Sequence, residues 1–367
     1  MRPARAPWRQ WLPHGLLVAF LAVLVAGCGA SESYPQSTLH PKGDFAEVVD
    51  GLFQTTVFWA TIIFIGVEAA LLYAIFRFRA KPNDPEPAQT HGNTLVEIIW
   101  TVIPAAVLAF VAVPTVRVIF ETAEIPETSA DGSAPLRVDV VGHQWWWEFR
   151  YPDLGIVTAN ELHIPVGRTV DVRMKSVDVL HSWWVPQFAG KRDVFPNRET
   201  RIWFTAIDTG EYPGVCAEFC GLQHGRMAFY TMAVAPADFD AWVARRQADS
   251  AQAAIRPPVP PSDTTQPAPL PEDPQVAQGR QLFLTKACVG CHALGSAGAP
   301  TTVLGPNLGG IGTRRMIASG WLENTDANLA AWIKDPAAFK EGVAMAGVYQ
   351  VTDAEAAALA AFLRTRQ

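Results

Sequence analysis

The sequence predicts a multidomain protein in which a two-helix transmembrane hairpin is followed by an all-β domain and then by an all-α domain. Its 367 residues are more than one ordinary domain needs. Hydrophobic residues make up 49% of the chain and charged residues only 17%, a balance that favours membrane segments. The formal net charge of −6 does not indicate the basic surface that nucleic-acid binding requires, so we expect no nucleic-acid partner.

The N-terminal segment has the pattern of a secretory signal. Three arginines in the first nine residues precede an apolar run over residues 16–26, which is too short to span a bilayer. The run ends in Val25-Ala26-Gly27-Cys28, which resembles the bacterial lipoprotein processing box, where the cysteine is acylated. We therefore predict a lipoprotein-type signal peptide over residues 1–27 and a periplasmic segment over residues 28–46. An ordinary signal peptide with an incidental cysteine is the alternative.

Two long apolar segments predict transmembrane helices over residues 47–79 and 94–120. Each can cross a hydrocarbon core of about 30 Å at about 1.5 Å per residue. The intervening loop, residues 80–93, follows Arg77 and Arg79, and positive charge around a short loop marks the cytoplasmic side. We therefore expect a two-pass protein of the bacterial plasma membrane, in contact with lipid, whose later domains lie on the periplasmic face. Two buried core helices are the alternative.

Residues 130–246 contain short alternating runs rich in Val, Ile, Thr and aromatic residues, broken by Gly, Pro and Asp. This pattern predicts an antiparallel sandwich or barrel. The clearest predicted strands cover residues 136–141, 169–174, 200–205 and 228–234.

The chain then becomes rich in Pro, Ala, Ser, Thr and Asp over residues 247–275, which predicts a semi-extended linker because this composition cannot build a core. The last segment, residues 276–367, is mostly helical by pattern. Its final helix is predicted to start at Thr352, with Glu355 completing a capping box.

The segment from Cys216 to Met227 carries the densest set of metal ligands, because it also contains Cys220 and His224 within twelve residues. Soft sulfur ligands with imidazole select copper or zinc, and a weak methionine ligand is typical of copper electron-transfer sites. Two cysteines in one loop can bridge two coppers if a second histidine comes from elsewhere, and His181, at the end of a predicted strand, is the candidate. A disulfide would leave the histidine and methionine unexplained, and zinc seldom takes methionine.

At this point the chain resembles a known family. The loop, with His181-Ser-Trp-Trp-Val-Pro186 and Lys191-Arg-Asp193, is similar to the dinuclear copper-A domain of cytochrome c oxidase subunit II, a cupredoxin-like domain with Greek-key topology. The resemblance implies that both cysteines bridge the two coppers, that His181 and Met227 complete one copper, and that His224 and the backbone carbonyl of Glu218 complete the other.

The same resemblance assigns roles to three neighbouring side chains. The Glu218 carboxylate would face a magnesium ion at the junction with subunit I. Trp145 matches the surface aromatic through which electrons enter, although it could be an ordinary packed tryptophan, or the haem domain could dock at another edge. Glu97 resembles a glutamate at the mouth of a proton channel, and Glu68 is a weaker candidate; an ionisable group near a membrane boundary can also be simply solvated.

The C-terminal segment carries the pattern Cys288-Val-Gly-Cys291-His292, which predicts covalent attachment of one c-type haem, with the histidine as an iron ligand. A methionine should be the sixth ligand. Met345 precedes the last predicted helix, as in class I cytochrome c domains, and Met316 is the competitor. The segments around residues 305–308 and 332–336 also resemble the cytochrome domains fused to such oxidases, but Ala346 stands where relatives usually have proline.

These features imply subunit II of a proton-pumping cytochrome c oxidase, which accepts electrons through the fused haem c and the copper-A centre and passes them to the haems of subunit I for reduction of oxygen to water. The implied partners are subunit I, subunit III, and a soluble or membrane cytochrome c or an upstream cytochrome bc1-type complex as electron donor. A periplasmic copper-delivery lipoprotein is the alternative. A reductase such as that for nitrous oxide would need a further histidine-rich domain, whereas this chain has only eight histidines.

Overall fold

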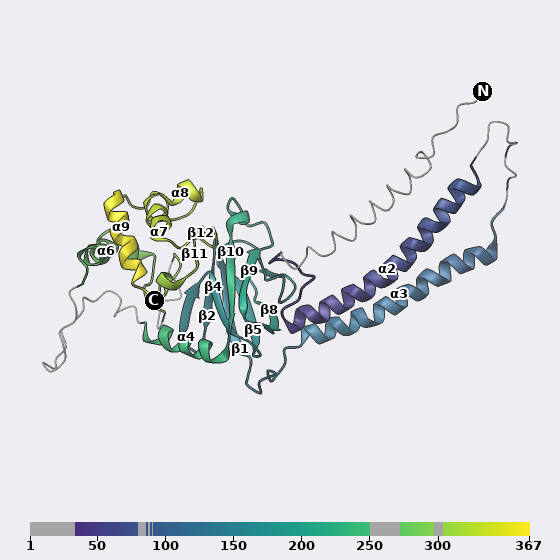
Figure 1. Ribbon diagram of the computed structural model, residues 1–367, viewed down its shortest axis with the longest axis horizontal. Helices are drawn as coiled ribbons and strands as arrows, with labels where there is room; N and C mark the ends of the chain where they lie inside the picture. Colours follow the sequence, from purple (N-terminus) through teal and green to yellow (C-terminus); the bar gives the residue numbers. More distant parts are fainter. Residues whose placement is uncertain (1–33, 80–85, 87–88, 90, 250–271, 297–303) are drawn as a thin grey trace, which may run out of the picture.

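The structure, a computed structural model, describes residues 34–79, 86, 89, 91–249, 272–296 and 304–367. Figure 1 shows a helical hairpin at one end, a β-domain in the middle and a small helical domain at the other end. The predicted signal peptide with Cys28 and most of the predicted linker lie outside the described residues. The order of the three parts agrees with the predicted order.

The hairpin consists of α2 (Asp44–Arg77) and α3 (Thr94–Ala123). Asn93 caps α3, because its side chain accepts hydrogen bonds from the backbone N–H groups of Leu95 and Val96. Both helices are long and apolar enough to span a membrane, and the most apolar stretch of each is not buried inside the protein. Large apolar side chains facing outward along both helices are what a lipid-exposed hairpin requires.

The β-domain is a sandwich of two five-stranded sheets, with strand orders β3-β2-β1-β5-β8 and β4-β10-β9-β6-β7. Its strands are β1 (Leu136–His143), β2 (Trp146–Tyr151), β3 (Ile156–Ala159), β4 (Glu161–Pro165), β5 (Thr169–Ser176), β6 (His181–Trp184), β7 (Arg192–Val194), β8 (Thr200–Thr205), β9 (Gly210–Cys216) and β10 (Ala228–Val234).

The sandwich is mixed rather than wholly antiparallel, which corrects one sequence expectation. β1 pairs with β5, and β10 with β4, in parallel. Alternating hydrophobicity predicts which residues face the core, but not the direction of the neighbouring strand, because both kinds of sheet bury alternate side chains. The four predicted strands are present, and they match β1, β5, β8 and β10.

Aromatic side chains fill the space between the two sheets. Trp183 lies between Phe204 and Phe229, with ring centroids 5.9 and 5.5 Å away, and all three are fully buried. One helix, α4 (Pro236–Ala248), follows β10 and packs Trp242 flat against His163, with centroids 4.6 Å apart. Because such rings bury large areas, they make this domain a rigid support for its loops.

The base of the hairpin is joined to the sandwich at β8. The Asp44 carboxylate accepts a hydrogen bond from the Thr205 backbone N–H at 2.7 Å, and the Trp203 indole N–H donates to the Thr122 carbonyl at 3.0 Å. Phe45 also packs edge-on against Trp203. Since these contacts come from both helices, they fix the orientation of the β-domain above the membrane segments.

The C-terminal domain contains α6 (Pro274–Thr285), η3 (Cys288–Gly290), η4 (Ile311–Thr313), β11 (Met316–Ile317), β12 (Leu322–Glu323), α7 (Asp326–Lys334), α8 (Pro336–Phe339) and α9 (Asp353–Arg364). Thr352 and Glu355 form the predicted capping box at the start of α9. Helices α6, α7 and α9 surround a core of apolar side chains that includes Phe283, Leu329 and Leu359. The domain packs against the sandwich on the side away from the hairpin (Figure 1).

Candidate metal centres

The copper-type ligands are brought together by strand register. β9 ends at Cys216, and β6 pairs with β9 so that Trp183 lies opposite Cys216. The Ala217 N–H donates to the Ser182 carbonyl at 2.8 Å, which continues this pairing past the last strand residue. His181, one residue further along β6, therefore faces the loop between β9 and β10.

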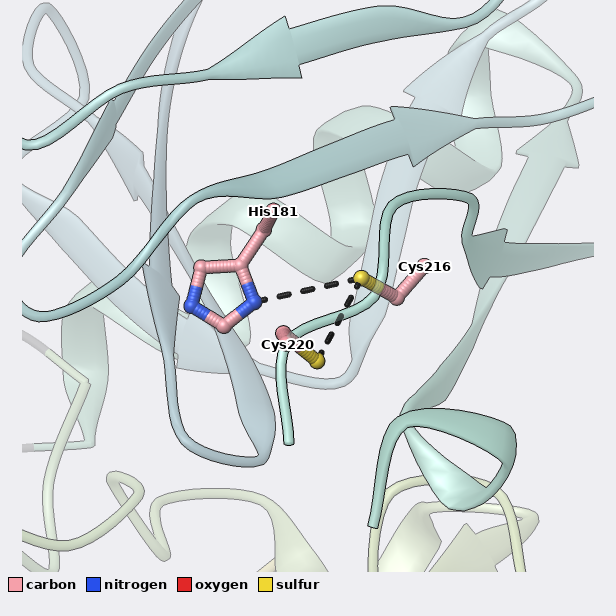
Figure 2. Close-up of side chains that lie close together, drawn as sticks. All are labelled: His181, Cys216 and Cys220. Atoms are coloured by element: carbon pink, nitrogen blue, oxygen red, sulfur yellow. Dashed lines mark hydrogen bonds between the residues drawn. The ribbon is translucent and has the colours of Figure 1, made fainter. Parts of the chain in front are cut away.

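The sulfur atoms of the two cysteines form the centre of the site. Their Sγ atoms lie 3.7 Å apart, well beyond the ~2.05 Å of a disulfide, and both cysteines are buried and free. His181 Nδ1 lies 3.9 Å from the Cys216 Sγ, and Figure 2 shows the ring turned toward it. Ligand atoms of His181, Cys216 and Cys220 all lie within 4.8 Å of one another.

The other three predicted ligands lie around the same sulfur pair. His224 Nδ1 and Met227 Sδ are each 3.7 Å from the Cys220 Sγ. The Glu218 carbonyl oxygen is 3.3 Å from the Cys216 Sγ. All six predicted ligand atoms therefore converge on one buried position, and their soft donors fit copper.

His181 is held by a carboxylate on the side away from the sulfurs. Its Nε2 donates to Asp178 Oδ1 at 2.8 Å, so Nδ1 is the nitrogen free to bind a metal. Burial lowers the pKa of His181, but hydrogen bonds to Asp178 and Cys216 outweigh it and raise the pKa overall. The pKa of Asp178 is lowered in turn, because hydrogen bonds from His181 and two backbone N–H groups outweigh its burial.

The two thiols titrate as a pair. The hydrogen bond from Cys220 lowers the pKa of the Cys216 thiol, and the same bond, with burial, raises the pKa of Cys220. One thiol therefore ionises much more readily than the other without a cation between them. A thiolate is the form that binds metal, so a cation here would favour loss of both protons.

The haem-type motif lies at the turn after α6. Cys288 is the first residue of η3 and Cys291 follows its last, and both are half-buried free thiols. His292 Nδ1 lies 2.8 Å from the Pro306 carbonyl, which can only accept, so Nδ1 carries the proton and Nε2 is free. Burial lowers the pKa of His292, which keeps the ring neutral. A neutral, oriented imidazole beside two thiols fits a covalently attached haem.

The two candidate axial methionines occupy different elements. Met345 is half-buried in the turn region between α8 and α9, at the place predicted from the sequence. Met316 lies in β11, which pairs with β12 through Glu323. The choice between them stays a prediction.

Trp145 lies against the copper loop. Its Nε1–H donates to the Cys220 carbonyl at 3.0 Å, and the side chain of its neighbour Gln144 donates to the same oxygen at 2.8 Å. The tryptophan is therefore one hydrogen bond away from a predicted copper ligand. In the hairpin, Glu97 lies exposed in the first turn of α3, and Glu68 is half-exposed in α2.

Sequence reasoning missed Asp178 and Gln144. Asp178 precedes His181 by three residues, a spacing with no special meaning outside a helix, and only the turn before β6 brings the two side chains together. An acidic residue just before a candidate ligand histidine was the one available signal.

The fold and both sites define a class: a membrane-anchored electron carrier whose outer part combines a copper-binding β-sandwich with a c-type cytochrome domain. Three family models match in the same order. The transmembrane domain of cytochrome c oxidase subunit II matches residues 42–118, its periplasmic domain matches residues 155–234, and cytochrome c matches residues 276–367.

Curated relatives match over nearly the whole chain. Cytochrome c oxidase subunit 2 of Alkalihalophilus pseudofirmus is 36% identical, covering 95% of this chain and 96% of that protein. The protein of the same name from Bacillus sp. strain PS3 is 33% identical, covering 97% and 96%. A crystal structure of the periplasmic domain of subunit II of cytochrome oxidase of Bradyrhizobium japonicum covers 30% of this chain and 91% of that chain, with 31% identity and a TM-score of 0.29.

The chain belongs to the cytochrome c oxidase subunit II family, in the form that carries a fused cytochrome c domain. It is the electron-transfer subunit of such an oxidase, anchored in a membrane by its hairpin, with copper and haem as its cofactors and subunit I as its partner.

Proposed function

We propose that this chain is the electron-accepting subunit of a proton-pumping oxidase of a bacterial plasma membrane, with a dinuclear copper-A centre and one covalent haem c on the periplasmic side. The proposed copper ligands are His181, Cys216, the Glu218 carbonyl, Cys220, His224 and Met227. The proposed haem ligands and attachment residues are Cys288, Cys291, His292 and Met345. The observation that carries the proposal is the convergence of the six copper-type donor atoms on one buried position.

The donor set favours two coppers over a single metal. Two thiolates, two imidazoles, a thioether and a carbonyl are more ligands than one tetrahedral zinc takes. Thiolates that can each bind two metals, with one imidazole for each metal, match a bridged copper pair. When bound, the copper pair and the haem supply reversible one-electron chemistry, and the task of these residues is to hold the donor atoms in place.

The arrangement of the domains supports a direction of electron flow. An external cytochrome c or an upstream bc1-type complex would reduce the cytochrome domain, which packs on the face of the copper domain that carries Trp145. Electrons would pass to the copper domain and on to subunit I. Trp145 is proposed to lie on this route, because its indole is hydrogen-bonded to the Cys220 carbonyl.

Three finer assignments belong to the same proposal. The Glu218 carboxylate is half-buried beside the copper loop and would hold magnesium at the junction with subunit I. Glu97 would stand at the mouth of a proton channel in subunit I. Subunit III would complete the complex, and residues 1–27 would be a lipoprotein signal that leaves Cys28 acylated.

The test is the metal and haem content of the full chain, purified in its oxidase from a host that attaches haem. We expect about two coppers per chain beyond any copper that subunit I holds, and one covalent haem, with thiolate-to-copper bands beside the haem Soret band. Replacing Met345 with Ala should remove methionine ligation from the haem spectrum, whereas Met316→Ala should leave it intact. Zinc, or a copper ratio of about one, would overturn the dinuclear assignment.

A further inference from the structure

The cytochrome domain and the copper domain are joined by a compact set of hydrogen bonds around Trp145. The Ser319 hydroxyl donates to the Trp145 carbonyl at 2.7 Å, and the Ala228 N–H donates to the Ser319 carbonyl at 3.1 Å. Figure 1 shows β11 and β12 beside β10, where these bonds form. The contact therefore lies immediately next to the copper loop.

Lys340 is the most unusual residue in this contact. It lies just after α8, is only 2% exposed, and its ammonium donates to three backbone carbonyls. These belong to Arg226 at 2.7 Å, Ala318 at 3.2 Å and Trp145 at 3.4 Å. Burial and the nearby Arg226 guanidinium lower the pKa of Lys340 to about 7, and burying such a group is costly unless its N–H groups are bonded.

Two of the three acceptors of Lys340 are in the other domain. Arg226 belongs to η2 (His224–Arg226), between two predicted copper ligands, and Trp145 lies in the turn between β1 and β2. Among the described residues, the cytochrome domain itself gives Lys340 one acceptor, the Ala318 carbonyl, so the other two hydrogen bonds form when the two domains are docked.

Arg226 makes the reciprocal contact from the copper domain. Its guanidinium donates to the Phe339 carbonyl at 2.5 Å and lies over the Trp321 ring at 4.4 Å. The neighbouring Gln223 side chain donates to the Glu341 carbonyl at 2.7 Å. Each domain therefore sends a basic side chain into backbone carbonyls of the other, and the bond from the Arg226 guanidinium is of the strong, charge-assisted kind.

These contacts bring the end of the Lys340 loop against the copper loop. A Cβ atom on Gly342 would lie 3.2 Å from Leu222 Cδ2 and 3.7 Å from Trp145 Cη2. Met345, the proposed axial ligand, follows three residues later in the same loop. The position of that loop relative to Trp145 is thus determined by the contacts of Lys340 and Arg226.

We propose that Lys340 and Arg226 form a reciprocal latch that fixes the cytochrome domain on the copper domain and positions the Met345 loop against Trp145 and the copper loop. Both are positioning residues for electron transfer between the two domains, and the proposal rests on the proposed function. Fixed docking matters because two domains that are already held in the reactive geometry do not have to find it before each electron transfer.

The test uses the full chain in its oxidase, with Lys340→Met, Arg226→Met and the double variant. Methionine keeps the length and apolar contacts of these side chains but cannot donate. Lys334→Met is the matched control, because Lys334 lies in the same domain but pairs with Asp353 at the surface. Copper content, haem content and both optical spectra are measured first, so that each variant is compared with both centres intact.

Amide hydrogen exchange then measures whether the cytochrome domain stays docked on the copper domain. Loss of either cation should speed exchange of the Ala228 amide, which crosses the interface, by roughly tenfold to a hundredfold, since that is the equilibrium worth of a charged hydrogen bond. Amides inside α9 should exchange as in the wild type. If the Ala228 amide of the double variant exchanges at the wild-type rate, the proposed latch is wrong.

The rate of electron transfer from haem to copper measures whether the Met345 loop is correctly positioned. After photochemical reduction of the haem, transfer to copper in the wild type should not depend on solvent viscosity, because no docking step precedes it. In the double variant, transfer should become slower and should fall further as viscosity rises. The positioning role would be wrong if the double variant transferred electrons at the wild-type rate. It would also be wrong if the wild-type transfer rate depended on viscosity. A wild-type complex without copper or haem would instead contradict the proposed function.

Discussion

At the scale of single residues, the copper site depends on side chains that are not ligands. Asp178 shows this best, because one carboxylate joins His181, a proposed ligand, to the turn that carries Trp145. Its Oδ1 accepts from His181 Nε2, and its Oδ2 accepts from the Gln144 N–H at 2.6 Å. The same carboxylate therefore sets the orientation of the proposed ligand His181 and the start of the turn that carries Trp145.

Replacing Asp178 with Asn should weaken copper binding by roughly tenfold to a hundredfold, the usual effect of losing a carboxylate that orients a ligand histidine. The amide keeps the size of the side chain but loses the charge that holds the His181 ring. Competition with a chelator, followed by the thiolate-to-copper absorption, measures the affinity. Asp153→Asn, an exposed carboxylate on the same domain, is the control. Equal copper affinity in the two variants would contradict an orienting role.

Some residues could be predicted from the sequence because their chemistry is local. The Cys-Val-Gly-Cys-His pattern and the two-cysteine loop each carry their meaning within a few positions. Lys340 could not be recognised in this way. It stands in a glycine-containing polar loop, where a lysine is normally solvated, and it is buried only because a second domain packs over it.

At the scale of elements, the structure follows the sequence where the signals are periodic or capped. The hairpin helices, four of the strands and the capping box at Thr352 were all predicted. The parallel pairing of β1 with β5 was not, because strand direction depends on connections made elsewhere in the chain. The helix α4 lies at the end of the segment predicted as the β-domain. Its apolar face is short, because Phe239 and Trp242 are its buried aromatic residues, so its periodic signal in the sequence is weak.

Close packing of α6 and α9 depends on one glycine. A Cβ atom on Gly279 would lie 1.9 Å from the Ala358 carbonyl oxygen and 2.8 Å from Phe362 Cβ. The first of these is backbone, so the helices would have to separate to accept a methyl group. This is the element-scale reason for a glycine in the interior of a helix, where glycine otherwise costs stability.

Replacing Gly279 with Ala should therefore lower the free energy of unfolding of the cytochrome domain by about 1–3 kcal/mol or more, despite the better helix propensity of alanine. The melting temperature, followed by the haem Soret band in the full chain, measures the effect. Gln278→Ala, at the exposed neighbouring position, is the control and should melt close to the wild type. A Gly279→Ala variant as stable as the control would contradict the close crossing.

At the scale of the whole molecule, the three parts form one continuous sequence of contacts from membrane to haem domain. The hairpin is fixed to β8 through Asp44 and Trp203, and the cytochrome domain is fixed to the copper loop through Lys340 and Arg226. The copper site lies in the domain between them. This order could be predicted from the sequence, but the docking faces could not, because they join residues 81 to 195 positions apart.

The position of Trp145 between the copper loop and the cytochrome loops gives the last prediction. Replacing Trp145 with Leu should slow electron transfer from the haem domain to the copper domain several-fold and leave reduction of the haem by an external donor unchanged. The haem should then be more reduced during steady turnover than in the wild type. Stopped-flow absorbance of the haem and copper bands separates the two steps.

Trp145→Phe is the informative companion, because it keeps an aromatic ring but loses the N–H that donates to the Cys220 carbonyl. If electron transfer is close to the wild-type rate in Trp145→Phe but slow in Trp145→Leu, the aromatic ring carries the role. If both variants are slowed equally, the hydrogen bond carries it. If the haem of the Leu variant is no more reduced than that of the wild type, electrons do not pass by Trp145. The domains would then exchange electrons through another part of their interface, and Gly342 and Leu222 would be the next contact to alter.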